Sequence, residues 1–203
     1  MTENTVYKKT YSQPPVDIGE ILRYCGCTDA DDGFIGIVQN LLDEATKNIS
    51  YKVCYRFADI KIQGNNCDLG FVSVESADLA KNLKDCNRII LFAATVGIEI
   101  DRLIAKYSKI SPSKAVIMQA IGAERIEALC DTFCKDMANQ FSLKPRFSAG
   151  YGDLPLEIQK DIFAVLDCSK QIGLTLNNSM LMSPTKSVTA ITGIINTDTG
   201  ANK

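Results

Sequence analysis

The 203-residue chain contains no histidine and no tryptophan. Histidine is the commonest general base and the commonest nitrogen ligand of protein-bound metals. Its absence excludes a Ser-His-Asp triad or a Cys-His pair as the nucleophile of a covalent mechanism. Any catalysis must therefore use other groups, for which a thiolate activated by a neighbouring lysine or by a helix N-terminus is an option. We assign no catalytic or metal-binding residue.

Long apolar runs and a strong excess of one charge are also missing. No uninterrupted apolar segment approaches the roughly 20 residues that span a bilayer, and the N-terminus has no apolar stretch of signal-peptide length. The 22 Lys and Arg residues nearly balance the 24 Asp and Glu residues, and they form no basic run that could follow a phosphate backbone. The sequence thus predicts a cytoplasmic protein that binds neither a membrane nor nucleic acid.

Glycine-rich phosphate motifs are absent as well. The sequence contains neither GxGxxG nor GxxxxGK[ST], which are the usual signatures of dinucleotide and nucleotide triphosphate sites. Their absence disfavours nucleotide hydrolysis and the usual NAD-binding fold.

Cysteine, in contrast, is plentiful. Eight cysteines in a chain without an export signal are expected to be reduced thiols packed as small hydrophobic residues. Cys25 and Cys27 form a CxC pair, and Cys130 and Cys134 lie one helical turn apart. A thiol-metal protein therefore stays open as an alternative, although the CxxC pairs typical of structural zinc sites are absent.

Hydrophobic periodicity predicts an α+β fold, in which helices flank an antiparallel β-sheet. Helical spacing occurs over residues 16–25, 34–49, 77–86, 98–107, 112–141 and 154–168. Strand alternation predicts an antiparallel meander within 51–74, the apolar run 88–95 predicts a buried central strand, and short strands are expected at 174–176, 180–182 and 187–195. We expect one domain over residues 1–203, with a helical part at 16–50 and flexible ends at 1–15 and 196–203.

The longest predicted helix should begin at Ser111-Pro112, because proline is favoured at the first helical position. One side of this helix is apolar. The other side carries small residues around a carboxylate, namely Ala120, Ala123, Glu127, Cys130 and Cys134. A side with such small residues is expected to admit a close neighbour.

The loop Arg146–Tyr151, with the sequence RFSAGY, is the strongest candidate for a ligand site. It offers a cation at Arg146, a hydroxyl at Ser148, close backbone approach at Gly150 and an aromatic ring at Tyr151. An arginine binds a carboxylate at two points, and a glutamate across a cleft binds an ammonium group. These groups suit a zwitterionic nucleoside, although spacing alone equally supports an ordinary turn whose arginine pairs with a surface acid.

The residues resemble a known family, the activation (reactivation) domain of cobalamin-dependent methionine synthase, and especially short standalone proteins similar to that domain. The matching stretches are AIGAERIEALCDTF at 120–133, RxxxGY at 146–151, IGLTLNNS at 172–179 and SPTKSV at 183–188, with VDIGEILRYCG and ILFAATVG in the N-terminal half. The family's usual RPAxGY is RFSAGY here, and the YPxCP that often follows is replaced by Tyr151-Gly152-Asp153-Leu154-Pro155.

The resemblance implies that the chain binds S-adenosylmethionine. It assigns Arg146 to the methionine carboxylate, Glu127 to the amino group, and Ser148, Gly150 and Tyr151 to the adenosine. It further implies an accessory part in a methyltransferase, in which this chain holds the methyl donor while a Co(II) corrinoid is reduced and methylated.

The same resemblance implies the partners. Cobalamin would enter only through a separate corrinoid-binding protein or a methionine synthase that lacks its activation domain, with a flavodoxin-like protein as electron donor. The alternative is a non-catalytic binding or adaptor module for a corrinoid methyltransferase.

Overall fold

A four-stranded antiparallel sheet forms the centre of the protein, whose computed structural model describes residues 5–27 and 29–195. The strands are β1 (Tyr7–Tyr11), β2 (Tyr51–Asp59), β6 (Cys86–Thr95) and β9 (Ser187–Ile195), in the order β1-β2-β6-β9. Every residue of β6 from Ile89 to Thr95 is buried, because neighbouring strands flank it and both faces of the sheet are covered. The predicted central strand is thus confirmed.

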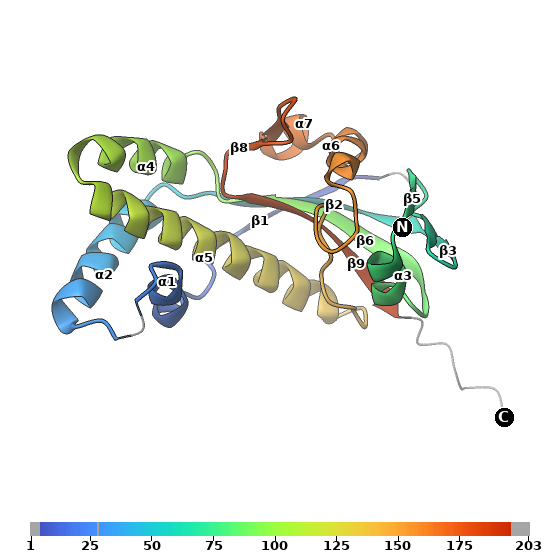
Figure 1. Cartoon of the computed structure of the whole chain (residues 1–203), viewed down its shortest axis with the longest axis horizontal. Helices are drawn as coiled ribbons and strands as arrows, with labels where there is room; N and C mark the ends of the chain where they lie inside the picture. Colours follow the sequence, from blue (N-terminus) through green and yellow to red (C-terminus); the bar gives the residue numbers. More distant parts are fainter. Residues whose placement is uncertain (1–4, 28, 196–203) are drawn as a thin grey trace.

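Helices cover both faces of this sheet (Figure 1). The long helix α5 (Pro112–Ala138) crosses one face, whereas α6 (Gln159–Leu166) and α7 (Cys168–Ile172) cover the other. Neighbouring residues of β2 divide between the two cores, since successive side chains of a strand point to opposite faces. Val53 belongs to the core under α5 and Cys54 to the core under α6 and α7.

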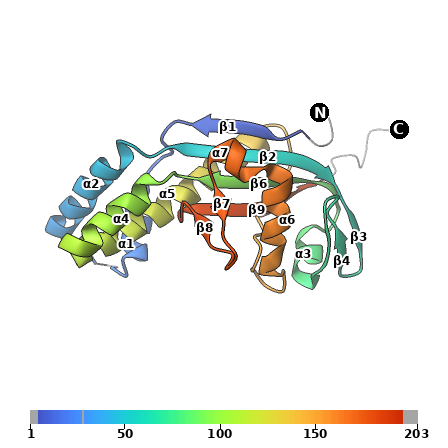
Figure 2. The ribbon, with the colours of Figure 1, turned by 90° about the horizontal axis from the view of Figure 1, so that it is seen from above.

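Three further helices pack against α5 at one end of the molecule (Figure 2). They are α1 (Ile18–Tyr24), α2 (Asp32–Thr46) and α4 (Glu99–Ile110). The carboxylate of Asp17 accepts the Glu20 amide at 3.0 Å and that of Asp31 accepts the Phe34 amide at 2.7 Å. Such N-caps satisfy donors that have no partner within a helix, so acidic residues mark the starts of α1 and α2.

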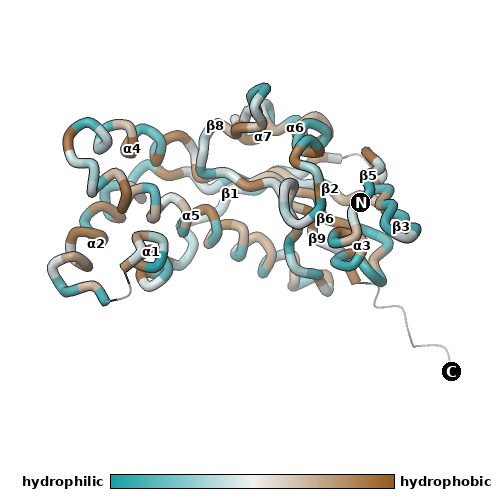
Figure 3. Tube along the Cα trace, viewed as in Figure 1, coloured by the Kyte–Doolittle hydropathy of each residue, from teal (hydrophilic) through white to brown (hydrophobic). Residues whose placement is uncertain are grey.

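The antiparallel meander predicted within residues 51–74 is confirmed for its later part, where three short strands pair in chain order around Gly64-Asn65. It is wrong for β2, which pairs with β1 and β6 rather than with the next strand along the chain. The short strands β3 (Lys61–Gln63), β4 (Asn66–Asp68) and β5 (Ser73–Glu75) form a separate sheet beside α3 (Ala77–Asn82), and β7 (Thr175–Leu176) pairs with β8 (Met182–Ser183). Hydrophilic residues gather around the three-stranded sheet of β3, β4 and β5 in Figure 3.

Two more expectations need correction. The sequence predicts a flexible segment at 1–15, whereas Tyr7–Tyr11 form β1, with Tyr7 opposite Tyr55. The helix predicted over 154–168 is interrupted, because a 3-10 turn at Leu156–Ile158 precedes α6 and Asp167 adopts a left-handed conformation with φ 48° before α7. The predicted flexible end at 196–203 lies outside the described residues.

The α+β prediction with one long helix is confirmed. Helix α5 has 27 residues with Pro112 in its first turn, which corresponds to about 40 Å of length. Within the described ranges, none of the helices combines the length and the apolar character that crossing a bilayer requires.

Candidate functional site

The segment that follows α5 runs along the outer edge of β9. The Lys144 amide donates to the Gly193 carbonyl at 2.8 Å, and Phe147 and Ile191 exchange two backbone hydrogen bonds of 2.9 and 2.8 Å. The segment therefore has the geometry of a short additional strand, and its successive side chains point to opposite faces of the sheet.

Arg146 and Phe147 project to these opposite faces. Phe147 is 7% exposed and packs in the core under α6. Arg146 reaches α5, where its Nη2 donates to Glu127 Oε2 at 3.1 Å and to Asp131 Oδ1 at 2.8 Å. The structure thus brings together two of the predicted residues, Arg146 and Glu127.

Asp131 is a member of this cluster that the sequence interpretation missed. It lies four residues after Glu127, and residues with that spacing are neighbours on one helix face. The four-residue spacing could have predicted Asp131, because a second carboxylate one turn further along the same helix face is within reach of the same arginine.

The ion pairs of Arg146 are partly open to solvent. The side chain of Arg146 is 25% exposed, compared with 44% for Glu127 and 58% for Asp131. Burial disfavours the charge of Arg146, but the thiols and carboxylates around it raise its pKa above the ordinary value, so it stays a cation. Since exposed ion pairs contribute only about 0–1 kcal/mol, a ligand carboxylate replaces them at little cost.

A pocket of about 380 Å³ lies between α1 and α5 and includes both carboxylates. Its polar lining is mostly acidic: Asp17 and Glu20 near α1, and Glu124, Glu127 and Asp131 on α5, with Tyr24 and Lys135 also present. Carboxylates that converge on one cavity create a negative potential there. The pocket between α1 and α5 therefore favours a ligand that carries positive charge.

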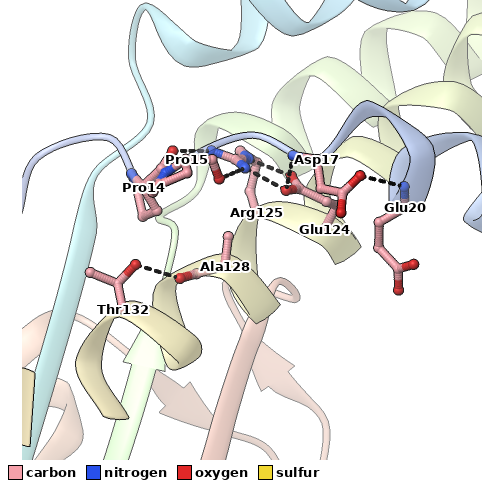
Figure 4. Close-up of polar contacts among 8 residues, drawn as sticks. All are labelled: Pro14, Pro15, Asp17, Glu20, Glu124, Arg125, Ala128 and Thr132. Carbon is pink, nitrogen blue, oxygen red and sulfur yellow. Dashed lines mark hydrogen bonds and ion pairs between the residues drawn. The ribbon is translucent and has the colours of Figure 1, made fainter. Parts of the chain in front are cut away.

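Glu124 and Arg125 form a buried ion pair beside this pocket (Figure 4), and the sequence did not predict it. Glu124 is 3% exposed and Arg125 is fully buried. The Arg125 guanidinium donates to both oxygens of Glu124, and it also donates to the carbonyls of Pro14 at 2.8 Å and Pro15 at 2.7 Å. Glu124 Oε1 in turn accepts the amide of Asp17 at 3.0 Å, so the pair ties the chain leading into α1 to α5.

Tyr151, the last residue of the predicted loop, lies on the α3 side. Tyr151 is 70% exposed and meets Phe147 edge-on, with ring centroids 5.6 Å apart. The loop closes on itself, because Tyr151 N donates to the Ser148 carbonyl at 3.1 Å and Gly150 N donates to the Leu154 carbonyl at 3.0 Å.

Tyr151 borders a second pocket, of about 470 Å³, together with Asp78, Lys81, Asn82, Lys144, Pro145 and Phe147. Within residues 5–27 and 29–195, the two pockets have no lining residue in common. Arg146 and Glu127 thus meet on one side of the loop, and Tyr151 lies on the other.

Asp153 fastens the loop to α3. Its carboxylate accepts hydrogen bonds from the Ser76 hydroxyl and from the amides of Ala77 at 2.7 Å and Asp78 at 3.3 Å. The Ser76 hydroxyl and these amides hold the pKa of Asp153 below its usual range. At Gly152, where φ is +55°, a Cβ would come within 2.4 Å of Asp78 Oδ2. Gly152 and Asp153 therefore serve the contact between the loop and α3.

The cysteines of the described residues are free thiols. Burial raises the pKa of Cys130 to about 12 and also raises that of Cys25, so both stay protonated near neutral pH, and the thiolate is the form that binds metals. In the part of the chain that the structure describes, no three Cys, Asp or Glu side chains are grouped so that they could hold a metal ion.

Comparison with known proteins identifies the fold. No protein-family model matches the chain, and no curated protein matches its sequence. The chain is similar in structure to the crystal structure of the MetH reactivation domain bound to AdoHcy, with a TM-score of 0.71 and 14% sequence identity. The match covers 98% of this chain and 80% of that chain, and it confirms the fold that the sequence resemblance predicts.

Proposed function

We propose that the protein, which shares the fold of a MetH reactivation domain, binds S-adenosylmethionine and supports reductive methylation of a Co(II) corrinoid carried by a separate protein. One observation supports this most directly. On that fold, Arg146 forms exchangeable ion pairs with Glu127 and Asp131 at the edge of an acidic pocket.

The methionine end of the ligand fits this cluster. Its carboxylate takes the guanidinium of Arg146 in a two-point contact, which is the stronger geometry for such a pair. Glu127 is then released from Arg146 and accepts the ligand ammonium. The exchange replaces two partly exposed ion pairs, which are worth about 0–1 kcal/mol each, by two that the bound ligand shields from water.

The remaining parts of the ligand find chemical counterparts nearby. The sulfonium carries a positive charge, which the carboxylates of the pocket between α1 and α5 favour. We place the adenosine across the loop, near the backbone of Ser148 and Gly150, with the adenine on the exposed ring of Tyr151. Stacking of a base on an aromatic side chain is worth about 1–3 kcal/mol.

The part that this chain plays is to bind and orient. S-adenosylmethionine supplies the methyl group, and its demethylated product is AdoHcy, the ligand in the similar MetH structure. Reductive methylation of the corrinoid takes up one electron from a flavodoxin-like donor and one methyl group. Arg146 and Glu127 hold the methyl donor in a fixed orientation, and the loop limits the access of water. Fixed orientation and exclusion of water both accelerate reactions in enzyme sites.

The experiment that tests this function combines the chain with a Co(II) corrinoid protein, a one-electron reductant and S-adenosylmethionine labelled in its methyl group. We expect methyl transfer faster than in the absence of the chain. Arg146→Ala should lower the rate, and Lys109→Ala, an exposed cation of α4, should leave it unchanged.

The same assay separates the two classes of function. Ligand binding without any gain in methyl transfer would instead support an adaptor module. Absence of S-adenosylmethionine binding would show that the proposal is wrong.

A further inference from the structure

We propose that Arg125 is a positioning residue of the pocket between α1 and α5, which holds the α1 wall in place without contact with the ligand. Arg125 is fully buried and is not part of the pocket lining. Its effect on a ligand must therefore act through other residues. The identity of that ligand rests on the proposed function, but the positioning itself does not.

The hydrogen bonds of Arg125 join Glu124 on α5 to the segment that precedes α1. A buried charge is costly unless it is paired and hydrogen-bonded, and Arg125 meets this need with Glu124 and with the carbonyls of Pro14 and Pro15. Figure 4 shows the guanidinium between Glu124 and the two prolines. The planar fork of arginine is what allows one side chain to reach all three partners.

The segment before α1 depends on these bonds. Pro14 and Pro15 have no amide hydrogen, so their carbonyls are the only backbone groups with which they can anchor the segment. Both carbonyls accept hydrogen bonds from Arg125, and the amide of Asp17, the N-cap residue of α1, donates to Glu124. The ion pair therefore satisfies the backbone at the point where the chain enters α1.

Helix α1 has little stability of its own. It contains 7 residues, and isolated helices shorter than about 12–15 residues are marginal in water. Its apolar side packs on the core through Ile21, which is fully buried, and through the partly buried Ile18 and Leu22. Its N-terminal end is held by the anchored segment before it. Since Asp17, Glu20 and Tyr24 line the pocket opposite Glu127 and Asp131, movement of α1 would remove one wall and leave the Arg146 cluster intact.

Arg125→Lys tests the anchor. Lysine keeps the charge, but one ammonium group on a flexible stem cannot reproduce the fork that joins Glu124 to both carbonyls. In hydrogen exchange, we expect the amides of Ile18–Tyr24 to exchange about 10-fold faster or more, because local opening of this unit costs less free energy. The amides of β6 should keep their rates. This measurement needs no ligand.

The effect on ligand affinity is tested against a control variant that is destabilised elsewhere in the fold. We expect Arg125→Lys to raise the Kd for S-adenosylmethionine about 10-fold in isothermal titration, which corresponds to about 1.4 kcal/mol. Ile162→Ala truncates a fully buried side chain of α6, on the opposite face of the sheet. Ile162→Ala should lower the melting temperature at least as much as Arg125→Lys does, with no change in the Kd for S-adenosylmethionine. If Arg125→Lys does not fold, Glu124→Gln, which keeps an acceptor for the Asp17 amide, takes its place in the exchange measurement alone, because Glu124 itself lines the pocket.

Two results would overturn the proposal: unchanged exchange over Ile18–Tyr24 in the Arg125 variant, or an equal rise in Kd for Ile162→Ala. If the wild-type protein does not bind S-adenosylmethionine, the proposed function fails, whereas the exchange measurement still decides whether Arg125 positions α1.

Discussion

At the scale of single residues, Asp153 links the loop after α5 to α3 through an ionised carboxylate. Its pKa in the folded protein is below the ordinary value of about 3.9. The carboxylate therefore contributes stability above that ordinary pKa, and the contribution is lost as the pH falls through the lower folded-state pKa. We expect Asp153→Asn to lower the melting temperature near neutral pH and to match the wild type more closely as the pH falls below about 4.

Asp43→Asn is the matched control, because Asp43 is an exposed carboxylate of α2. Its melting temperature should stay near that of the wild type throughout the titration. A deficit of Asp153→Asn that stays constant from neutral to acidic pH would contradict the role of the ionised carboxylate.

The residues of the candidate site differ in how far the sequence could predict them. Arg146 and Glu127 were predicted as partners in a shared site, and the structure places them 3.1 Å apart at their nearest polar atoms. Glu124 and Arg125 were not, because adjacent charges in a helical sequence are normally solvated. Their burial depends on where residues 14–17 lie, and that is a tertiary property which the local pattern does not contain.

At the scale of elements, the packing of α4 on α5 depends on Gly122. A Cβ at this position would lie 2.7 Å from Ile100 Cγ2 and 2.8 Å from Lys186 Cε. Ile100 is fully buried, so it has no room to move. We expect Gly122→Ala to lower the free energy of unfolding by about 1–3 kcal/mol, as overpacking of a core does, measured by urea denaturation.

Gly36→Ala provides the comparison within a helix of the same protein. Nothing lies within 4 Å of a Cβ at Gly36 in α2, so alanine there should stabilise by up to about 1 kcal/mol through helix propensity. The account of the α4–α5 contact is wrong if Gly122→Ala is as stable as Gly36→Ala.

Elements whose signal is local were predicted best. The starts of α1 and α2 follow from acidic caps, and β6 follows from its continuous apolar run. Strand β1 was missed because YKKTY, at the edge of the sheet, has two lysines and a threonine between its terminal tyrosines, so it lacks an apolar alternation. The pairing of β2 with β6 was missed because strand partners distant in sequence are set by the tertiary fold.

At the scale of the whole molecule, the acidic pocket should distinguish ligands by charge. S-adenosylmethionine carries a sulfonium that AdoHcy lacks, and the pocket between α1 and α5 is lined mainly by carboxylates among its charged groups. We expect S-adenosylmethionine to raise the melting temperature more than AdoHcy at equal concentration. The difference should shrink as salt is added, because exposed charges are screened.

Thermal denaturation with each ligand, at low and at high salt, provides this comparison. A ligand present at 100 times its Kd stabilises the folded state by about 2.7 kcal/mol, which such a measurement detects readily. A larger shift with AdoHcy than with S-adenosylmethionine would count against charge recognition by the pocket.

The arrangement of the molecule as a whole centres on α5. This helix supplies the core of one sheet face, the buried ion pair that anchors α1, and the carboxylates that meet Arg146. The loop carrying Arg146 continues the sheet beyond β9 and reaches α3 through Asp153. The ligand site proposed for this chain is therefore built where α1, α5 and the loop come together at one edge of the sheet.

The most direct test of that site is isothermal titration of S-adenosylmethionine into the wild-type protein, Arg146→Ala and the control Lys109→Ala. We predict saturable binding to the wild type and to the control. The Arg146 variant should bind at least about 10-fold more weakly, since hydrogen bonds to charged groups contribute about 1.5–3 kcal/mol. Absence of binding to the wild type, or equally tight binding by Arg146→Ala, would contradict the account.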